Sequence, residues 1–525
     1  MGPQYNGEYG KQLNTLSHSL NTAAKSSHYA DIARSRIHPK RGKTTMKRIL
    51  LAAALCGLPL CALADIGVDG ARHLLLRTGF GANPAQIAVF APLSREAAVD
   101  KILAGARTQA ITPPPGWANE PFERPGQPGL SEEQKKALQQ ERNQHAVELR
   151  SWWLTEMRNT PSPLTEKMTL FWHNHFVSAL DKVRSPQMMY QQNLLLRHYA
   201  LGDFGQLLHA VARDPAMMRY LDTANNRKEQ PNENFAREVM ELFTLGEGHY
   251  TEQDIREAAR AFTGWGLDHD DQFIVRPRLR DTGDKLIFGQ RGNFDGDDVV
   301  DLLLQQPQTS VFITNKLWRN FVSPTPDAAA VNKLAADFRR NHYQLKPLMR
   351  ALLLTPQFWR SQGQLVKSPV ELTVGTLVTF DLMPPDWRVI AGLNRQLEQD
   401  VFAPPNVKGW PGGEAWINSA TLLTRKQFLD RITHDAAPAR DAFAQADGSM
   451  NEMAGREARI NRFVAKGVAS MKLQPDEWAA IYDVKSASDA ARMLLAVPPA
   501  NPLPQGESGA KAIAQLLMDP SYQVE

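Results

Sequence analysis

Four polar side chains share one face of a predicted helix between residues 232 and 246. Successive helical residues are about 100° apart, so one narrow arc contains Asn234, Arg237, Glu238 and Glu241. Apolar residues fill much of the remaining surface, which predicts a buried helix. Because an unpaired buried charge is costly, the arc is expected either to line a cavity or to form a structural ion-pair network.

The paired carboxylates of this arc are the candidate catalytic groups. Glu238 and Glu241 are three residues apart, which places their Cβ atoms roughly 5–6 Å apart on a helix. Neighbouring carboxylates can differ in pKa and act as general acid and general base. Asn234 and Arg237 are candidate substrate-binding residues, with Arg237 suited to an anionic group. His249, in the glycine-rich turn after the helix, is a further acid–base candidate, or simply an exposed loop histidine.

His173 and His175 form a second candidate site, for a metal ion. On a continuous helix they diverge by about 200° and cannot share a face. If the helix ends at Trp172 and the chain turns extended, both imidazoles can face one ion, and Glu238 can complete the shell. Imidazole pairs suit zinc, copper, iron or nickel. The alternative, which we favour, is two separately hydrogen-bonded structural histidines, so a divalent metal is left open as a cofactor.

A loop rich in glycine and proline, from Lys408 to Asn418, contains two tryptophans. Exposed Trp410 and Trp416 beside a carboxylate would suit stacking against sugar rings. Buried tryptophans would instead hold the loop in place. The sequence supports both interpretations.

Longer motifs extend beyond these single residues. They are Asn232-Glu-Asn-Phe-Ala-Arg-Glu-Val-Met-Glu-Leu-Phe-Thr-Leu-Gly246, Tyr250-Thr-Glu-Gln-Asp254, Ala258-Ala-Arg-Ala-Phe-Thr-Gly-Trp265, His73-Leu-Leu-Leu-Arg-Thr-Gly-Phe-Gly81, Phe171-Trp-His-Asn-His-Phe176, Lys316-Leu-Trp-Arg-Asn-Phe-Val322, Lys367-Ser-Pro-Val-Glu-Leu372 and Pro405-Asn-Val-Lys-Gly-Trp-Pro411. Together they resemble the bacterial exported family called "domain of unknown function 1800", over roughly residues 67–431. The resemblance implies an exported, mainly helical protein, and a partner of the exported sulfatase-like kind. It implies no particular reaction.

The first 64 residues read as a leader. Met46-Lys-Arg, an apolar run and Ala62-Leu-Ala64 have the build of a secretory signal peptide, which predicts a mature start at Asp65 and a periplasmic or secreted protein. The two cysteines, Cys56 and Cys61, lie in this leader, so the mature chain has no thiol chemistry. Of 60 Lys and Arg and 56 Asp and Glu, nine and two respectively lie in residues 1–64, which leaves the rest slightly acidic. That balance gives no reason to expect nucleic-acid binding.

Periodicity and capping signals predict an all-α, mainly helical fold with more than a dozen helices. Helix starts stand out at Ser131, Thr251 and Asn418, and a small β-hairpin insert is expected near 270–290. We expect an upstream extension without a fold of its own at 1–45, a signal peptide at 46–64, a large helical domain at 65–435 and a helical C-terminal extension at 436–525. No transmembrane segment is expected in the mature chain.

Three functions fit these patterns. The first is an enzyme acting on an envelope or extracellular glycan, a polysaccharide, with Glu238 and Glu241 as acid and base. The second is a metal-dependent enzyme built on His173 and His175. The third is a non-catalytic export or assembly partner of an exported sulfatase-like protein. Whether the two motifs converge on one open site is the structural observation that distinguishes them.

Overall fold

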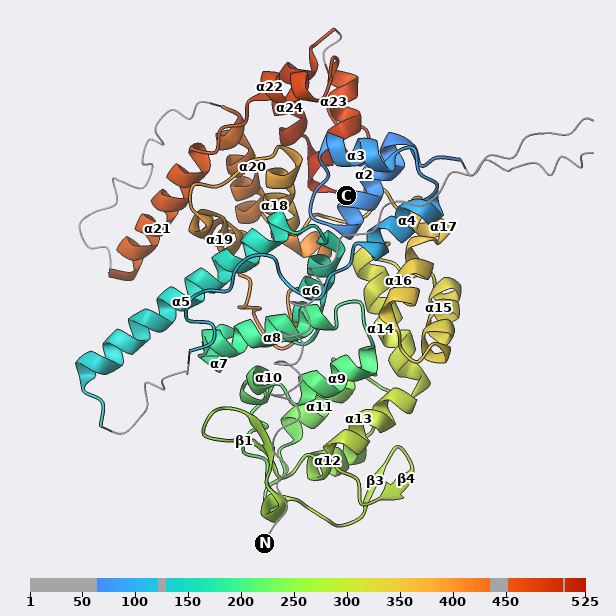
Figure 1. Ribbon diagram of the computed structural model, residues 1–525, viewed down its shortest axis with the longest axis vertical. Helices are drawn as coiled ribbons and strands as arrows, with labels where there is room; N and C mark the ends of the chain where they lie inside the picture. The colour runs from blue at the N-terminus through green and yellow to red at the C-terminus, as the bar shows by residue number, and fades with distance from the viewer. Residues whose placement is uncertain (1–63, 121–128, 435–451, 504–505) are drawn as a thin grey trace, which may run out of the picture. The chain divides into compact units, whose positions relative to one another are not determined.

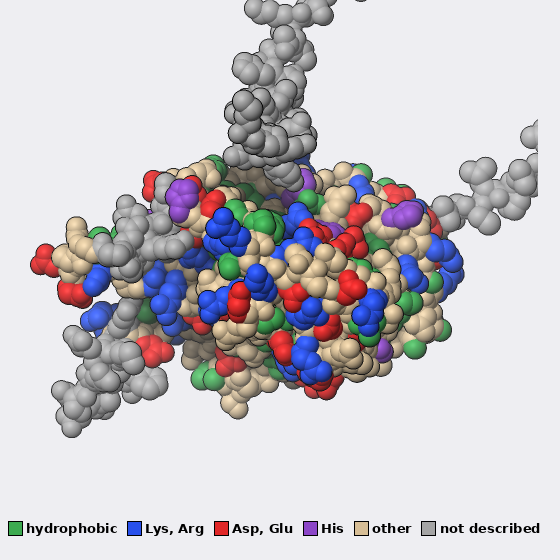
Figure 2. All heavy atoms as spheres, turned by 90° about the horizontal axis from the view of Figure 1, so that it is seen from below, with side chains coloured by type: hydrophobic (Ala, Val, Ile, Leu, Met, Phe, Trp, Pro, Cys, Tyr) green, Lys and Arg blue, Asp and Glu red, His purple; other side chains and the backbone are tan. Residues whose placement is uncertain are grey.

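The computed structural model of the chain describes residues 64–120, 129–434, 452–503 and 506–525 (Figure 1). The expected extension at 1–45 and signal peptide at 46–64 fall outside these residues, apart from Ala64. In the described part, no helix combines the length and the apolar character needed to cross a bilayer. Acidic and basic side chains are interspersed over the face that Figure 2 presents.

The described chain is mainly helical, which confirms the all-α expectation. Its first half contains α2 (Gly67–Thr78), α3 (Pro84–Phe90), α4 (Arg95–Ala104), α5 (Glu132–Asn159), α6 (Pro163–His175), α7 (Leu180–Val183), α8 (Pro186–His198), α9 (Phe204–Ala212), α10 (Pro215–Tyr220), α11 (Glu233–Glu241) and α12 (Glu252–Ala261). The second half contains α13 (Gly296–Gln305), α14 (Pro307–Phe321), α15 (Ala328–Arg340), α16 (Leu345–Leu353), α17 (Pro356–Trp359), α18 (Pro369–Thr379), α19 (Trp387–Gln396), α20 (Ser419–Thr433), α21 (Glu452–Ala469), α22 (Pro475–Ile481), α23 (Ala487–Leu494) and α24 (Gly509–Met518). Short 3-10 helices are η1 (Pro277–Leu279), η2 (Gly413–Trp416) and η3 (Pro520–Gln523).

The β insert consists of two separate two-stranded antiparallel sheets. The first pairs β1 (Trp265–Leu267) with β2 (Phe273–Val275), and the second pairs β3 (Lys285–Ile287) with β4 (Gln290–Gly292). The expected insert is therefore present as two hairpins. Phe288 and Gly289 explain the second one, because both have positive φ, at 48° and 76°. A two-residue turn of that kind matches the twist of the strands that it joins.

Capping side chains set where several helices begin. Ser131, Thr251 and Asn418 each accept a backbone N–H at the start of α5, α12 and α20. In all three helices the third residue returns a bond to the cap, which completes a capping box. The helix starts expected from the sequence at these positions are confirmed.

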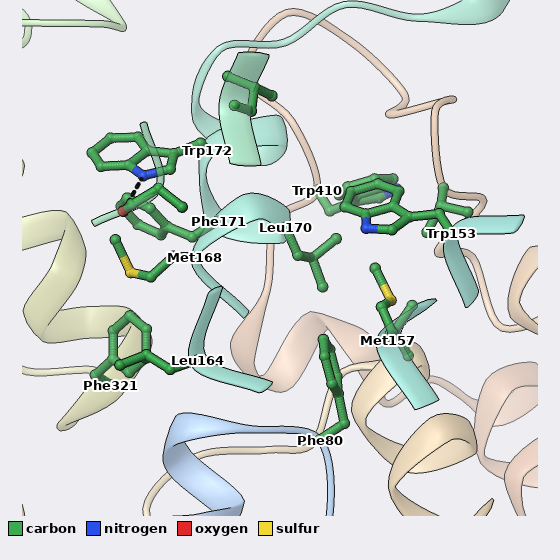
Figure 3. Close-up of a cluster of buried hydrophobic side chains, with 14 of the residues drawn as sticks. Phe80, Trp153, Met157, Leu164, Met168, Leu170, Phe171, Trp172, Phe321 and Trp410 are labelled. Carbon is green, nitrogen blue, oxygen red and sulfur yellow. Dashed lines mark hydrogen bonds between the residues drawn. The ribbon is translucent and has the colours of Figure 1, made fainter. Parts of the chain in front are cut away.

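Helix α6 runs through the hydrophobic core and is buried along nearly its whole length (Figure 3). Leu164, Met168 and Trp172 recur at helical spacing and are fully buried. The Trp172 Nε1–H, which needs a partner when buried, donates to the Ala200 carbonyl at 3.0 Å. On another side of the helix, Leu170 lies toward Trp153 and Met157 of α5.

The C-terminal helices pack onto the rest of the chain. Helix α23 contacts α2, α21 contacts α19 and α20, and α24 contacts α20. Beyond α24, Val524 pairs with Val366 as an isolated antiparallel bridge. The described part of the expected extension at 436–525 therefore shares one core with the helices before it.

Buried charges join these distant segments. Lys167 of α6 forms ion pairs with Glu371 of α18 and, at 3.4 Å, with Glu525. Arg77 of α2 donates to the Glu525 carbonyl at 2.8 Å, and Lys367 donates to the Tyr522 carbonyl at 2.8 Å. Burial alone would lower the pKa of Lys167, but Glu371 and Glu525 outweigh burial and raise it. The lysine is therefore charged, and its charge is balanced inside the protein.

Replacing Lys167 by Met should lower the free energy of unfolding by about 3–5 kcal/mol, because two buried carboxylates lose their cation. Lys182→Met is the matched control, since the exposed pair of Lys182 with Asp222, at 2.8 Å, should contribute less than about 1 kcal/mol. Urea unfolding of the two variants measures both effects. Equal small losses would show that the buried charges do not hold these segments together.

Candidate functional site

The polar arc of α11 faces outward. Phe235, Ala236, Val239 and Met240 are buried against the core, whereas Asn234 is exposed and the other three polar residues are half-buried. The expectation of a buried helix holds for its apolar residues and is wrong for its polar arc. The helix is amphipathic, and its polar face borders solvent instead of a closed interior.

Glu238 is the carboxylate with the most unusual surroundings in this arc. Burial raises the pKa of Glu238, the negative charge of Glu241 raises it further, and Arg237 and Lys408 only partly oppose the shift. Among the described residues, none donates a hydrogen bond to its carboxylate. A proton is therefore held more readily at Glu238 than at an ordinary surface glutamate.

Glu241 is oriented by a phenol. The Tyr250 hydroxyl donates to Glu241 Oε2 at 2.7 Å. Burial and this bond to Glu241 together raise the pKa of Tyr250 well above its usual value. The two carboxylates of the pair thus have different neighbours, as an acid and a base require.

Arg237 is occupied by other side chains of the protein. Its guanidinium donates to both carboxylate oxygens of Glu252, at 2.8 and 2.9 Å, and lies 3.5 Å from Glu233. The fork that was expected to receive an anionic substrate group is therefore already taken. Asn234, which is exposed, donates through Nδ2 to the Leu221 carbonyl at 3.2 Å.

Two further polar groups surround Glu238. Lys408 is exposed, and its charge acts on Glu238 from the loop between α19 and α20. Burial raises the pKa of Tyr220, at the end of α10, and the charges of Asp181 and Glu238 raise it further. His249 lies exposed in the turn after α11.

His175 supports the end of the glutamate helix. Its Nε2 lies 3.1 Å from the Phe243 carbonyl, and its Nδ1 lies 3.0 Å from Lys316 Nζ. A carbonyl can only accept, so Nε2 donates to it and Nδ1 accepts from Lys316. Burial lowers the pKa of His175, and the Lys316 charge lowers it further. Lys316 also donates to the Leu242 carbonyl at 3.3 Å. The neutral His175 ring and Lys316 thus satisfy two carbonyls at the end of α11.

Asn174, between the two histidines, holds the Trp410 loop. The backbone N–H of Trp410 donates to Asn174 Oδ1 at 2.7 Å. Gly409 lies so close that a Cβ atom there would come within 2.2 Å of Asn174 Oδ1, and its φ is +81°. Only glycine fits this approach without displacement. The loop and its Lys408 are thereby fixed beside α11.

His173 points into an aromatic pocket. Its ring centroid lies 5.4 Å from that of Trp153, 5.3 Å from Phe402 and 5.7 Å from Trp410. Burial lowers the pKa of His173 to about 3, so the ring is neutral. His173 and His175, both on α6, thus have entirely different neighbours, as helical spacing requires.

The two candidate histidines are not part of a cluster of metal-ligand side chains. Over the described residues, the one set of three or more His, Cys, Asp or Glu side chains close enough to share an ion is Asp268, His269 and Asp270, in the turn between β1 and β2. Both nitrogens of His175 already have partners in the protein. A shared ion would require Lys316 and the Phe243 carbonyl to be displaced.

The tryptophans do not form an exposed wall. Trp410 and Trp416 are each only 5% exposed. Trp410 lies beside Trp153 in the core (Figure 3). The stacking role expected for these rings is therefore corrected to a structural one, because the backbone of their loop is held by Asn174 and its indoles point inward.

The sequence model of a family described as "Protein of unknown function (DUF1800)" matches residues 73–524. The chain belongs to this family. The match extends well beyond Arg431, where the resemblance seen in the motifs ends, and includes the C-terminal helices. No curated protein and no solved structure matches the chain.

Four of the quoted motifs meet around one surface site. Within Phe171–Phe176, His175 bonds to the end of α11 and Asn174 bonds to the loop at Pro405–Pro411. Lys316 donates to His175. Sequence reasoning alone missed Lys408, Tyr220, Tyr250 and Lys316 as neighbours of the site. Lys408, Tyr250 and Lys316 belong to the quoted motifs, whereas Tyr220 lies outside all of them and had no signal in the sequence.

The close approach of Gly409 to Asn174 can be tested with two glycines of the same loop. Gly409→Ala should cost about 2–5 kcal/mol, from its positive φ and from the steric conflict. Gly412→Ala should cost about 1–3 kcal/mol, from its backbone conformation alone, because Gly412 has φ +71° and ψ −177° but no heavy atom near its Cβ position. Denaturant unfolding followed by tryptophan fluorescence measures both. Equal costs would mean that the loop is not held against Asn174.

Proposed function

We propose that the chain is an exported acid–base enzyme that cleaves an envelope or extracellular glycan at the α11 site. The single observation behind the proposal is Glu238, a half-buried carboxylate whose pKa is raised by burial and by Glu241 and which has no hydrogen-bond donor among the described residues. Perturbed carboxylates without a structural partner are typical of functional sites.

The chemistry divides between the two carboxylates. Protonated Glu238 gives its proton to the leaving oxygen as the glycosidic C–O bond breaks. Ionised Glu241, oriented by Tyr250, accepts a proton from the water whose oxygen forms the new C–O bond. Lys408 is exposed beside Glu238 and offers a cation to an acidic sugar, a role that Arg237 cannot fill while it is paired with Glu252.

The metal-dependent alternative is less well supported. His173 and His175 have separate surroundings, and His175 positions the end of α11 through two hydrogen bonds. We infer that the histidine motif acts as a scaffold for the carboxylate site. Export to the periplasm or the medium, and an exported sulfatase-like partner, belong to the same proposal and rest on the leader and on the family resemblance.

Glu238→Gln should lower glycan cleavage by about 10²–10⁴-fold, because the proton donor is lost. The melting temperature should stay the same or rise, because the amide removes a charge that burial and Glu241 disfavour. Glu247→Gln is the matched control, since Glu247 is exposed in the neighbouring turn. The assay is reducing-end release from a panel of bacterial envelope and extracellular glycans. Cleavage that is equal in the two variants would remove Glu238 from the mechanism.

A second variant tests the coupling between the two carboxylates. Glu241 raises the pKa of Glu238, so Glu241→Gln should lower that pKa. The protonated acid is then lost at a lower pH, and the alkaline limb of residual activity should move downward. A severe loss of stability in both Gln variants would instead identify the pair as structural.

The proposed export has its own test. Cleavage after Ala62-Leu-Ala64 should give a mature protein that begins at Asp65. N-terminal sequencing of the protein from its native host, separated into periplasmic and cytoplasmic fractions, measures this start. A cytoplasmic protein that retains residues 46–64 would contradict export.

A further inference from the structure

A second concave site lies between α5, α7, α19 and α21. It is a groove of about 1000 Å³, lined along α5 from Gln139 to Arg150 and along α19 from Arg388 to Gln396. That volume is at the upper end of the range for small-molecule sites. No residue of α11 lines it, so the groove is separate from the carboxylate pair.

Arginine dominates the charged side chains of the groove. Five arginines and three carboxylates line it: Arg142, Arg150, Arg184, Arg388, Arg395, Asp181, Asp400 and Glu457. Arg150 is paired with Asp400 at 2.5 Å, and Arg388 with Asp386 at 2.5 Å. Within the described ranges, Arg142, Arg184 and Arg395 have no carboxylate at ion-pair distance. The groove thus contains guanidinium groups that no described carboxylate neutralises.

Two of these arginines are close enough to repel each other. Burial lowers the pKa of Arg142, and the charge of Arg184 lowers it further. The Arg142 side chain donates to Gln139, and Arg184 donates through Nε to the Asp181 carbonyl at 3.4 Å, so the hydrogen-bond partners of both among the described residues are neutral. Guanidinium groups bind phosphate, sulfate and carboxylate through paired hydrogen bonds. An anion placed between the two would relieve their repulsion.

Apolar side chains line much of the rest of the groove, together with four amide side chains. Its lining includes Ala146, Leu180, Ala391, Ala403, Ile460 and Phe463. Ile460 and Phe463, on one side of α21, remain 37% and 43% exposed. Large apolar side chains left in water beside a cationic cluster suit a ligand with an alkyl part. A sugar is a poorer match, because Phe463 is the one aromatic ring among the lining residues.

We propose that this groove binds an amphiphilic anion, with a phosphate, sulfate or carboxylate headgroup between Arg142 and Arg184 and an alkyl chain along Ile460 and Phe463. The site is independent of glycan cleavage at Glu238. Binding would neutralise the arginines and cover the exposed face of α21 in a single event.

The test uses the full chain and three probes below their micelle concentrations. Decyl phosphate carries both features, decyl glucoside has the same alkyl chain without charge, and inorganic phosphate has the charge without the chain. Calorimetric titration should give saturable binding of decyl phosphate, with the other two probes at least about tenfold weaker. The double variant Arg142→Gln/Arg184→Gln should weaken decyl phosphate by about tenfold or more. Ile460→Ser should weaken decyl phosphate and leave inorganic phosphate unchanged.

Arg291→Gln is the matched control, because Arg291 is exposed on β4, outside the groove. The melting temperatures of the unliganded variants should equal that of the parent chain, which separates loss of the site from loss of the fold. The proposal is overturned if inorganic phosphate binds as tightly as decyl phosphate, if decyl glucoside binds equally well, or if the double variant and Arg291→Gln give the same affinity.

Discussion

The structure depends on the buried charge of Lys167. A lysine in the middle of a core helix is stable only if anions reach it, and here Glu371 and Glu525 come from segments far along the chain. Those anions bring further cations, Arg77 and Lys367, into the same interior. Helices α2, α6 and α18 and the segment after α24 are therefore fixed relative to one another by a requirement for charge balance that apolar packing alone would not impose.

Helix α6 also connects the buried charges around Lys167 with the candidate site at the surface. Lys167 and His175 lie on α6, separated by about 12 Å along the helix axis. At the far end of α6, Asn174 holds the Trp410 loop and His175 satisfies the end of α11. The carboxylate pair and Lys408 thus belong to elements that meet because one rigid helix contacts both. A site that requires accurate placement is supported from the core and does not rely on its own loops.

Local features of this structure were predictable from the sequence, and long-range ones were not. The capping boxes at Ser131 and Thr251 and the polar arc of α11 follow from residue type and spacing over a few positions. The burial of Trp410 depends on Asn174, 236 residues away. The pKa of His175 is lowered by its burial in the core and then by Lys316, 141 residues away. No local pattern distinguishes a loop tryptophan that meets such a partner from an exposed one. The residues of α11 alone predict a buried helix. In the structure, Glu252 of the next helix pairs with Arg237 of the polar arc at the surface.

Glu238 differs from two buried glutamates of this chain in its hydrogen-bond partners. Glu166 accepts both arms of the Arg197 fork, at 2.6 and 2.8 Å, together with the Trp153 indole, and Glu156 accepts the backbone N–H groups of Ile111 and Thr112. Glu238, half-buried beside another glutamate, has no such donor in the described part of the chain, and burial and the charge of Glu241 raise its pKa. Glu166 and Glu156 have donors that hold them in the structure, so Glu238 differs from both in having no structural partner. A raised pKa and the lack of a structural partner are the properties expected of a residue that transfers a proton.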